Sequence, residues 1–157
     1  MNLEILEELD KDTKITKIFN KYTCAYCGES ATDRDHIIPR SISNFNPKSA
    51  STNKSNTIPS CKQCNVSLGN RFIITISERA EFLIKLYNKK FKNLLSMPHH
   101  TKEDISELEG SLKKMVRSQM NKKQIILDRL SNLELIVLLE PSIKDIWEVI
   151  DRKGEYE

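Results

Sequence analysis

The sequence predicts a small α+β protein, mostly α-helical, in which a cysteine-rich module lies between two helical segments. All four cysteines fall in two Cys-x-x-Cys pairs, and the residues between the pairs show little helical periodicity. Beyond the second pair, apolar residues recur three and four positions apart, which is typical of amphipathic helices. These patterns divide the chain into an N-terminal helical segment, the module and a helical extension: 1–21, 22–75 and 76–157.

The N-terminal segment carries acidic residues early and lysines late, an order that suits the helix dipole. Its apolar residues recur at helical spacing: Leu3, Leu6, Leu9, Ile15 and Ile18. In the module, residues 33–38 and 57–59 are predicted β-strands, 41–55 is a polar loop and 62–70 is a short helix.

Four polar residues mark predicted helix starts in the extension: Ser77, Thr101, Ser131 and Ser142. The last three have an acidic residue three positions later, which is the capping-box pattern. We expect a break at Pro98 after the first helix and an end at Gly154 for the last. The helix that begins after Thr101 is expected to turn Leu112 and Met115 inward, with its other apolar residues.

The cysteine spacing predicts a structural zinc site. Two residues between thiolates let both sulfurs of a tight turn reach one ion, and two such turns complete a tetrahedral site. The expected ligands are Cys24, Cys27, Cys61 and Cys64. Two disulfides are the alternative, but they require an oxidising compartment, and the sequence begins with no apolar signal segment. A thioredoxin-like redox pair would use one such motif on a βαβ unit, which this chain lacks.

Composition limits the partners of this chain. Its 157 residues contain no apolar run long enough for a membrane span, so we expect a soluble, cytoplasmic protein. No glycine-rich phosphate loop is present, which argues against energy coupling. The net charge is only +3, yet three stretches contain no acidic residue: 36–77, 82–102 and 110–127. Such stretches suit a phosphate backbone, although the last two also fit ordinary solvated helix faces.

Asp35, His36 and Asn65 have the chemistry of a metal-dependent phosphodiesterase site. A neutral imidazole can deprotonate water, while a hard divalent ion offsets negative charge that develops at a phosphate. One carboxylate and one carboxamide suit Mg²⁺ or Mn²⁺ rather than zinc. On a strand, the side chains of Asp35 and His36 point to opposite faces, so one can bind the ion while the other faces the attacking water.

Several sequence elements occur in the order that is typical of one nuclease family: Cys24-x-x-Cys27, Asp35-His36-Ile37-Ile38-Pro39-Arg40-Ser41, Asn56-Thr57-Ile58-Pro59-Ser60-Cys61-x-x-Cys64-Asn65 and Gly69-Asn70-Arg71. Through them the chain resembles the HNH endonucleases, which belong to the ββα-metal nucleases. The resemblance implies two short strands and a helix around one catalytic ion, braced by a four-cysteine zinc.

The resemblance also implies roles for individual residues. Asp35 corresponds to the first metal ligand and His36 to the general base. Asn56 corresponds to the middle Asn, which steadies the loop and helps to orient the base; Asn53 is the alternative at a less suitable spacing. Asn65 corresponds to the second metal ligand, or else caps the helix that follows the second cysteine pair. The implied cofactors are a structural zinc and a catalytic Mg²⁺ or Mn²⁺.

The expected activity is hydrolysis of phosphodiester bonds in double-stranded DNA, and the resemblance implies 5′-phosphate and 3′-hydroxyl ends. Arg40, Arg71 and Lys62 are the expected phosphate contacts, whereas Tyr87 and Trp147 are expected in the core. A zinc-braced binding module without catalysis and a nuclease that cleaves RNA are the alternatives. Three roles fit the helical extension: pairing two chains, contacting flanking DNA, or binding a protein partner in a phage or defence system.

Overall fold

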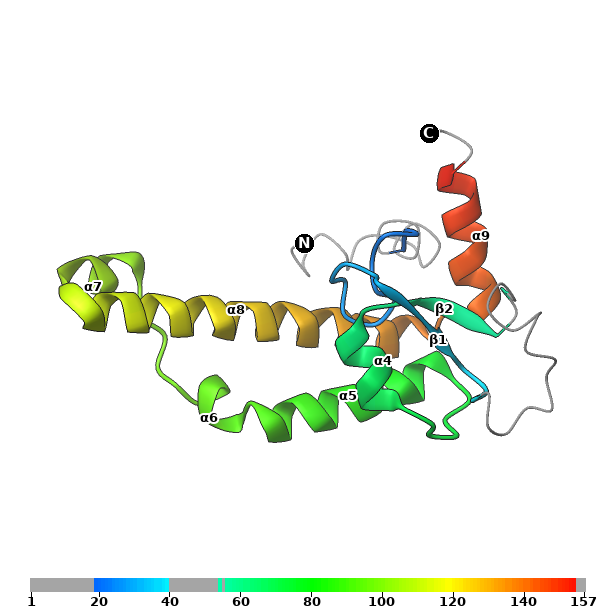
Figure 1. Cartoon of the computed structure of the whole chain (residues 1–157), viewed down its shortest axis with the longest axis horizontal. Coiled ribbons are helices and arrows are strands. Elements are labelled where there is room, and N and C mark those ends of the chain that lie inside the picture. The colour runs from blue at the N-terminus through cyan, green and yellow to red at the C-terminus, as the bar shows by residue number, and fades with distance from the viewer. Residues whose placement is uncertain (1–18, 40–53, 55, 155–157) are drawn as a thin grey trace.

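The computed structural model describes residues 19–39, 54 and 56–154, which form a mostly helical protein with one two-stranded antiparallel sheet (Figure 1). The predicted mostly helical α+β fold is confirmed. The elements in chain order are β1 (Asp33–His36), β2 (Thr57–Ser60), α4 (Lys62–Leu68), α5 (Ile76–Lys90), α6 (Lys92–Leu95), α7 (Lys102–Glu107), α8 (Gly110–Leu139) and α9 (Ile143–Gly154). Nearly all of the predicted N-terminal helix and of the loop 41–55 lies outside the described residues.

The sheet fixes the orientation of Asp35 and His36. Asp35 pairs with Ile58 across the antiparallel sheet, and His36 pairs with Thr57. Because side chains alternate along a strand, Asp35 is buried while His36 is only half-buried. Both predicted strands are present, and the side chains of Asp35 and His36 point to opposite faces of β1, as expected.

Helix α4 begins directly after β2, and its N-cap is a cysteine. Cys61 takes the capping position, where its sulfur accepts a hydrogen bond from the Cys64 backbone N–H at 3.4 Å. Asn65 therefore does not cap this helix; it lies inside it and donates its backbone N–H to Cys61 O at 3.0 Å. The helix ends at Gly69, whose φ of 53° favours glycine.

The first helix of the extension, α5, begins earlier than the sequence predicts. Its N-cap is Thr75, not Ser77, because Glu78 stands three positions after Thr75 and completes a reciprocal capping box. The predicted boxes at Thr101 and Ser142 are both present, with Asp104 and Asp145 as their acidic partners. This explains the starts of α7 and α9 from local sequence alone.

Helix α8 corrects two predictions. It runs through 30 residues without a break at Ser131, so the helix start predicted there is wrong. Buried side chains continue on both sides of Ser131 at helical spacing, and packing of this stripe against α5 favours one continuous helix. Leu112 and Met115 were expected inside, yet they are 49% and 52% exposed. They lie in the first half of α8, which extends away from the sheet toward α7 (Figure 1).

One hydrophobic core joins the module to the extension. It includes Phe19 from the end of the N-terminal segment. From the module it includes Tyr26, Ile37, Ile58 and Leu68, and from the extension Leu83, Tyr87, Leu133, Ile136 and Ile146. Tyr87 and Trp147 are core residues, as predicted. Burying each large side chain contributes about 1.5–3 kcal/mol, so the helices support the small sheet. In the described part of the chain, no helix is both long and apolar enough to cross a membrane.

Candidate functional site

The four cysteine sulfurs form one compact, buried cluster. All four lie within 4.8 Å of one another, and the Cys27 and Cys61 sulfurs are 3.7 Å apart. A tetrahedral zinc with Zn–S bonds of ~2.3 Å would separate its sulfurs by ~3.8 Å. The predicted clustering is therefore confirmed, and the geometry is compatible with a closed structural zinc site.

Crowding of the four thiols perturbs their protonation. Hydrogen bonds raise the pKa of the Cys64 thiol, and the bond with Cys24 has the largest effect, followed by those with Cys27 and Cys61. Hydrogen bonds from Cys24 and Cys27 lower the pKa of Cys61, while that of Cys24 falls to about 7. Thiols that share protons in this way must release them to bind a metal.

Helices α5 and α8 supply the outer contacts of this cluster. The Tyr87 hydroxyl lies 3.5 Å from the Cys64 sulfur, and burial raises the pKa of Tyr87, which keeps its proton. Asn132 Nδ2 donates to Cys27 O at 3.1 Å. Glycine suits position 28 because its φ is 75°, and a Cβ there would lie 2.7 Å from Nδ2 of Asn132, which would have to shift. Such outer contacts orient metal ligands.

Asp35, His36 and Asn65 meet at a second site, beside the four-cysteine cluster. The three residues line one hollow of about 290 Å³ between the end of β1 and α4, together with Arg34, Pro39, Gly69 and Asn70. Carboxylate and carboxamide oxygens suit a hard cation. Asp35 and Asn65 are therefore the residues that could hold Mg²⁺ or Mn²⁺, with the His36 imidazole beside them.

Asp35 has partners that the sequence did not reveal. It is 1% exposed, and its Oδ2 accepts hydrogen bonds from the Tyr26 hydroxyl and from Arg79 Nη1, the latter at 2.8 Å. Arg79 is fully buried, so the two charges form an interior ion pair. Both bonds reach the same carboxylate oxygen, and Asp35 is also one of the residues that line the hollow.

Asn56 does not line the hollow but fixes the chain just after His36. Its Oδ1 accepts from the Ile38 N–H at 2.8 Å, and its Nδ2 donates to Ile38 O at 3.1 Å. Its backbone carbonyl accepts from the Ile37 N–H at 3.0 Å. These bonds suit a residue that steadies the loop after His36, while Asn53 lies outside the described residues.

A family comparison bears on this arrangement. Residues 24–71 match the family model described as HNH endonuclease. This stretch is an HNH domain. The match spans both cysteine pairs, β1, β2 and α4. No curated protein and no solved structure matches the chain.

The expected phosphate contacts of the HNH domain are placed unevenly. Arg40 lies outside the described residues, and Lys62 is exposed at the start of α4 without lining the hollow. Arg71 Nη1 donates to Ser67 O at 3.1 Å and Leu68 O at 3.2 Å, which places its charge at the C-terminus of α4. That position stabilises the helix end.

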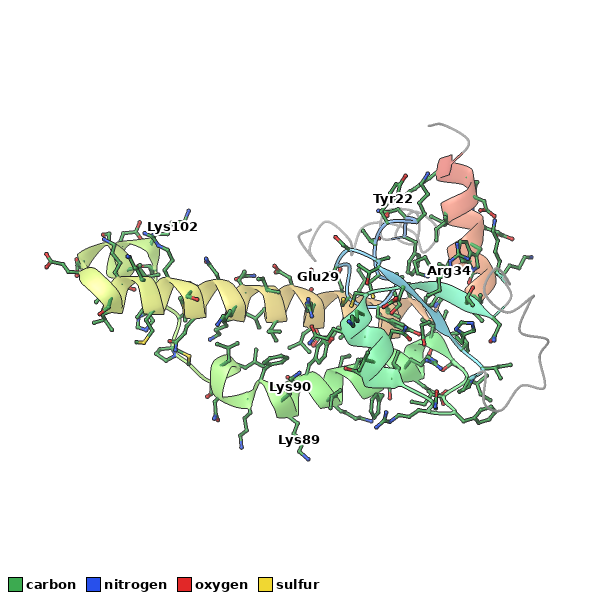
Figure 2. All side chains as sticks on the ribbon, viewed as in Figure 1. Tyr22, Glu29, Arg34, Lys89, Lys90 and Lys102 are labelled. Carbon is green, nitrogen blue, oxygen red and sulfur yellow. The ribbon has the colours of Figure 1, made fainter. Side chains whose placement is uncertain are left out.

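Arg34 is a basic residue at the hollow that the sequence analysis missed. It stands two residues before His36 on β1, so both side chains share a face of the strand. Its guanidinium lies 5.2 Å from the centre of the Trp147 ring, on the side of the sheet where α9 lies (Figure 2). Nothing in the local sequence distinguishes Arg34 from other exposed cations, because α9 is remote in sequence.

The buried partners of Asp35 had weak signals in the sequence. Arg79 occupies an inward position of α5, among the buried residues Ile76, Ala80, Leu83 and Tyr87. A charged residue in such an apolar stripe indicates a buried partner. Tyr26 lies between the cysteines of the first pair, where the turn directs it into the core.

Proposed function

We propose that this chain is a metal-dependent endonuclease that hydrolyses phosphodiester bonds in double-stranded DNA. The carrying observation is that Asp35, His36 and Asn65 line one hollow inside the HNH domain. The domain belongs to a nuclease family, and a module that only bound DNA would have no use for an imidazole beside two oxygen ligands.

In this proposal His36 acts as the general base. It accepts a proton from the water that attacks the phosphorus, and the Asn56 clamp on the following residues limits its movement. Asp35 and Asn65 hold the Mg²⁺ or Mn²⁺. When bound, this ion offsets negative charge on the phosphate and favours departure of the 3′-oxygen. Cleavage then leaves 5′-phosphate and 3′-hydroxyl ends.

Arg34 is the best-placed basic residue for a phosphate contact. It lines the hollow, it is exposed, and the Trp147 ring supports its guanidinium. A guanidinium can donate two hydrogen bonds to one phosphate. The contact would hold the scissile phosphate near His36, whereas Arg71 is engaged with the end of α4.

The zinc in this proposal has a structural role only. Four thiolates leave no open coordination position for water or substrate. The cluster would hold the first cysteine turn, β2 and α4 together, and its free thiols suit a reducing, cytoplasmic environment.

The first half of α8 is the second DNA-contacting surface in this proposal. Lys114, Arg117 and Lys122 are exposed there, and no acidic residue interrupts 110–127. The exposed Leu112 and Met115 on the same half favour a competing role in which two chains pair. These two roles make different predictions for salt dependence and for mass.

The deciding experiment incubates supercoiled plasmid with the purified chain and Mg²⁺, with and without EDTA, in parallel with a structured RNA. We expect Mg²⁺-dependent nicks or breaks that ligase reseals, as 5′-phosphate ends require. Because EDTA can also remove zinc, Mg²⁺ is restored to an EDTA-treated sample whose zinc content is measured. Plasmid binding without cleavage would support the zinc-braced binding module, and preferential RNA cleavage would support the RNA nuclease.

A further inference from the structure

Arg79 connects the helical extension to the strand that carries Asp35 and His36. Its Nη1 reaches Asp35 Oδ2 at 2.8 Å, and its Nη2 donates to His36 O at 3.1 Å and Ile37 O at 2.8 Å. Its Nε donates to Ile73 O at 2.9 Å. One fully buried guanidinium therefore holds a carboxylate and two consecutive carbonyls at the end of β1.

Tyr26 completes this arrangement from the zinc cluster. It lies between Cys24 and Cys27, is fully buried and donates its hydroxyl to the same Oδ2 of Asp35. Together with Arg79 Nη1, the Tyr26 hydroxyl places two donors on this one carboxylate oxygen.

We propose that Arg79 and Tyr26 are positioning residues, which fix the rotation of the Asp35 carboxylate so that Oδ1 is presented to the divalent ion in the hollow. This inference rests on the proposed function, in which Asp35 is an ion ligand. With both donors on Oδ2, the carboxylate offers one oxygen to the ion and cannot turn to offer both.

The type of each residue matters to this role. Arginine spreads its donors over a rigid plane, so it can hold Asp35, His36 O and Ile37 O at once, whereas a lysine ammonium is a single point. A buried ion pair is weak support for stability by itself, because desolvation offsets much of the attraction. In this proposal the ion pair orients the Asp35 carboxylate, since outer contacts of this kind tune how a ligand binds its metal.

The test measures Mn²⁺ binding directly, by water-proton relaxation, in the full zinc-loaded chain. Arg79→Lys keeps the charge but loses the planar donor set, and Tyr26→Phe removes one hydroxyl with little change in volume. Each should weaken Mn²⁺ binding by ~10–100-fold, with plasmid cleavage at fixed Mn²⁺ falling in parallel. Leu83→Ala is the matched control, because Leu83 is fully buried one turn further along α5, does not line the hollow and is not one of the four cysteines.

The control separates positioning from simple support of the fold. Leu83→Ala should lower the Tm yet leave the Mn²⁺ affinity of the folded protein within about twofold of wild type. All variants are measured at a temperature at which circular dichroism shows them folded. If Arg79→Lys does not fold, Tyr26→Phe alone carries the comparison.

Two results would overturn the inference. One is a folded Tyr26→Phe or Arg79→Lys variant that binds Mn²⁺ as tightly as wild type. The other is a Leu83→Ala control that loses as much affinity as they do. Failure of the wild-type chain to cleave any nucleic acid would instead contradict the proposed function, and the Mn²⁺ titration would still decide whether Arg79 and Tyr26 position Asp35.

Discussion

Trp147 Nε1 donates a hydrogen bond of 2.6 Å to the backbone carbonyl of Thr57. Thr57 faces His36 across the sheet, so the last helix of the chain is bonded to the strand that pairs with the strand of His36. The extension is therefore part of the framework that places His36. Truncation before α9 should disturb the site itself, not merely remove an appendage.

Loss of the general base should abolish cleavage without changing the fold. His36→Ala is expected to reduce the plasmid cleavage rate by ~10²–10⁴-fold, because no other imidazole among the described residues lines the hollow. Zinc content and DNA affinity should stay close to wild type, since His36 is half-buried and lies outside the cysteine cluster. Cleavage within a few-fold of wild type would show that His36 is not the base.

Metal retention should depend on pH in a defined direction. Zinc-bound thiols carry no proton, whereas unfolded cysteines are protonated below their pKa of about 8.5. The stability that zinc contributes is therefore present at high pH and lost as pH falls. The Tm of the zinc-loaded chain should decline from about pH 8 to about pH 5, with zinc release followed by a chromogenic chelator. In Cys61→Ser the Tm and the cleavage rate should both be low even at the higher pH.

The two proposed ligands of the catalytic ion should differ in their effect on stability. Asp35→Ala leaves the Arg79 guanidinium buried without its carboxylate, which should cost about 3–5 kcal/mol of unfolding free energy. Asn65 is half-buried on α4, so Asn65→Ala should cost less than about 1 kcal/mol of unfolding free energy. Both should remove Mg²⁺-dependent cleavage. Denaturant unfolding beside plasmid assays compares them, and equal stability of the two variants would contradict the buried ion pair.

Two arginines of the HNH domain should separate by function. Arg34→Ala removes a donor at the hollow and should slow cleavage by ~10²-fold with little change in Tm. Arg71→Ala removes contacts to Ser67 O and Leu68 O and should cost about 0.3–1 kcal/mol of stability with a smaller effect on rate. If Arg71→Ala cleaves plasmid more slowly than Arg34→Ala does, then Arg71 and not Arg34 is the phosphate contact.

The first half of α8 can be tested by charge reversal. Changing Lys113, Lys114 and Arg117 to Glu should weaken DNA binding for all sequences and flatten its salt dependence, which has a slope of about −0.9 per neutralised phosphate. Cleavage at saturating DNA should persist, because the hollow is unchanged. Titrations at several salt concentrations measure the slope.

Leu112→Glu is the matched change for the competing role of α8. If the exposed Leu112 and Met115 pair two chains, this variant should convert a dimer into a monomer in sedimentation while the salt slope stays unchanged. A slope that does not change in the triple Glu variant would exclude the DNA-contacting role.

The sequence by itself determined the local chemistry of this protein. The spacing of the cysteine pairs predicts the zinc cluster, because two tight turns can deliver four sulfurs to one point whatever surrounds them. Alternation along β1 separates Asp35 from His36, and the capping boxes at Thr101 and Ser142 set the starts of α7 and α9. The alternation, the capping boxes and the turn within each cysteine pair depend on neighbours within a few residues, so short-range geometry was sufficient for them. The meeting of the two pairs joins residues as far apart as Cys27 and Cys61, and it follows from the shared metal-ligand spacing.

Only the tertiary structure decided what surrounds that chemistry. Arg79 is 44 residues from Asp35, and no local rule pairs an arginine in α5 with a carboxylate on β1. Packing against α5 stabilises α8 as one continuous helix across Ser131, where the local capping pattern predicted a new helix start. The first half of α8 leaves Leu112 exposed, because an amphipathic stripe says which residues share a face but not whether another element covers it. Burial and pairing across long sequence separations are properties of the folded chain.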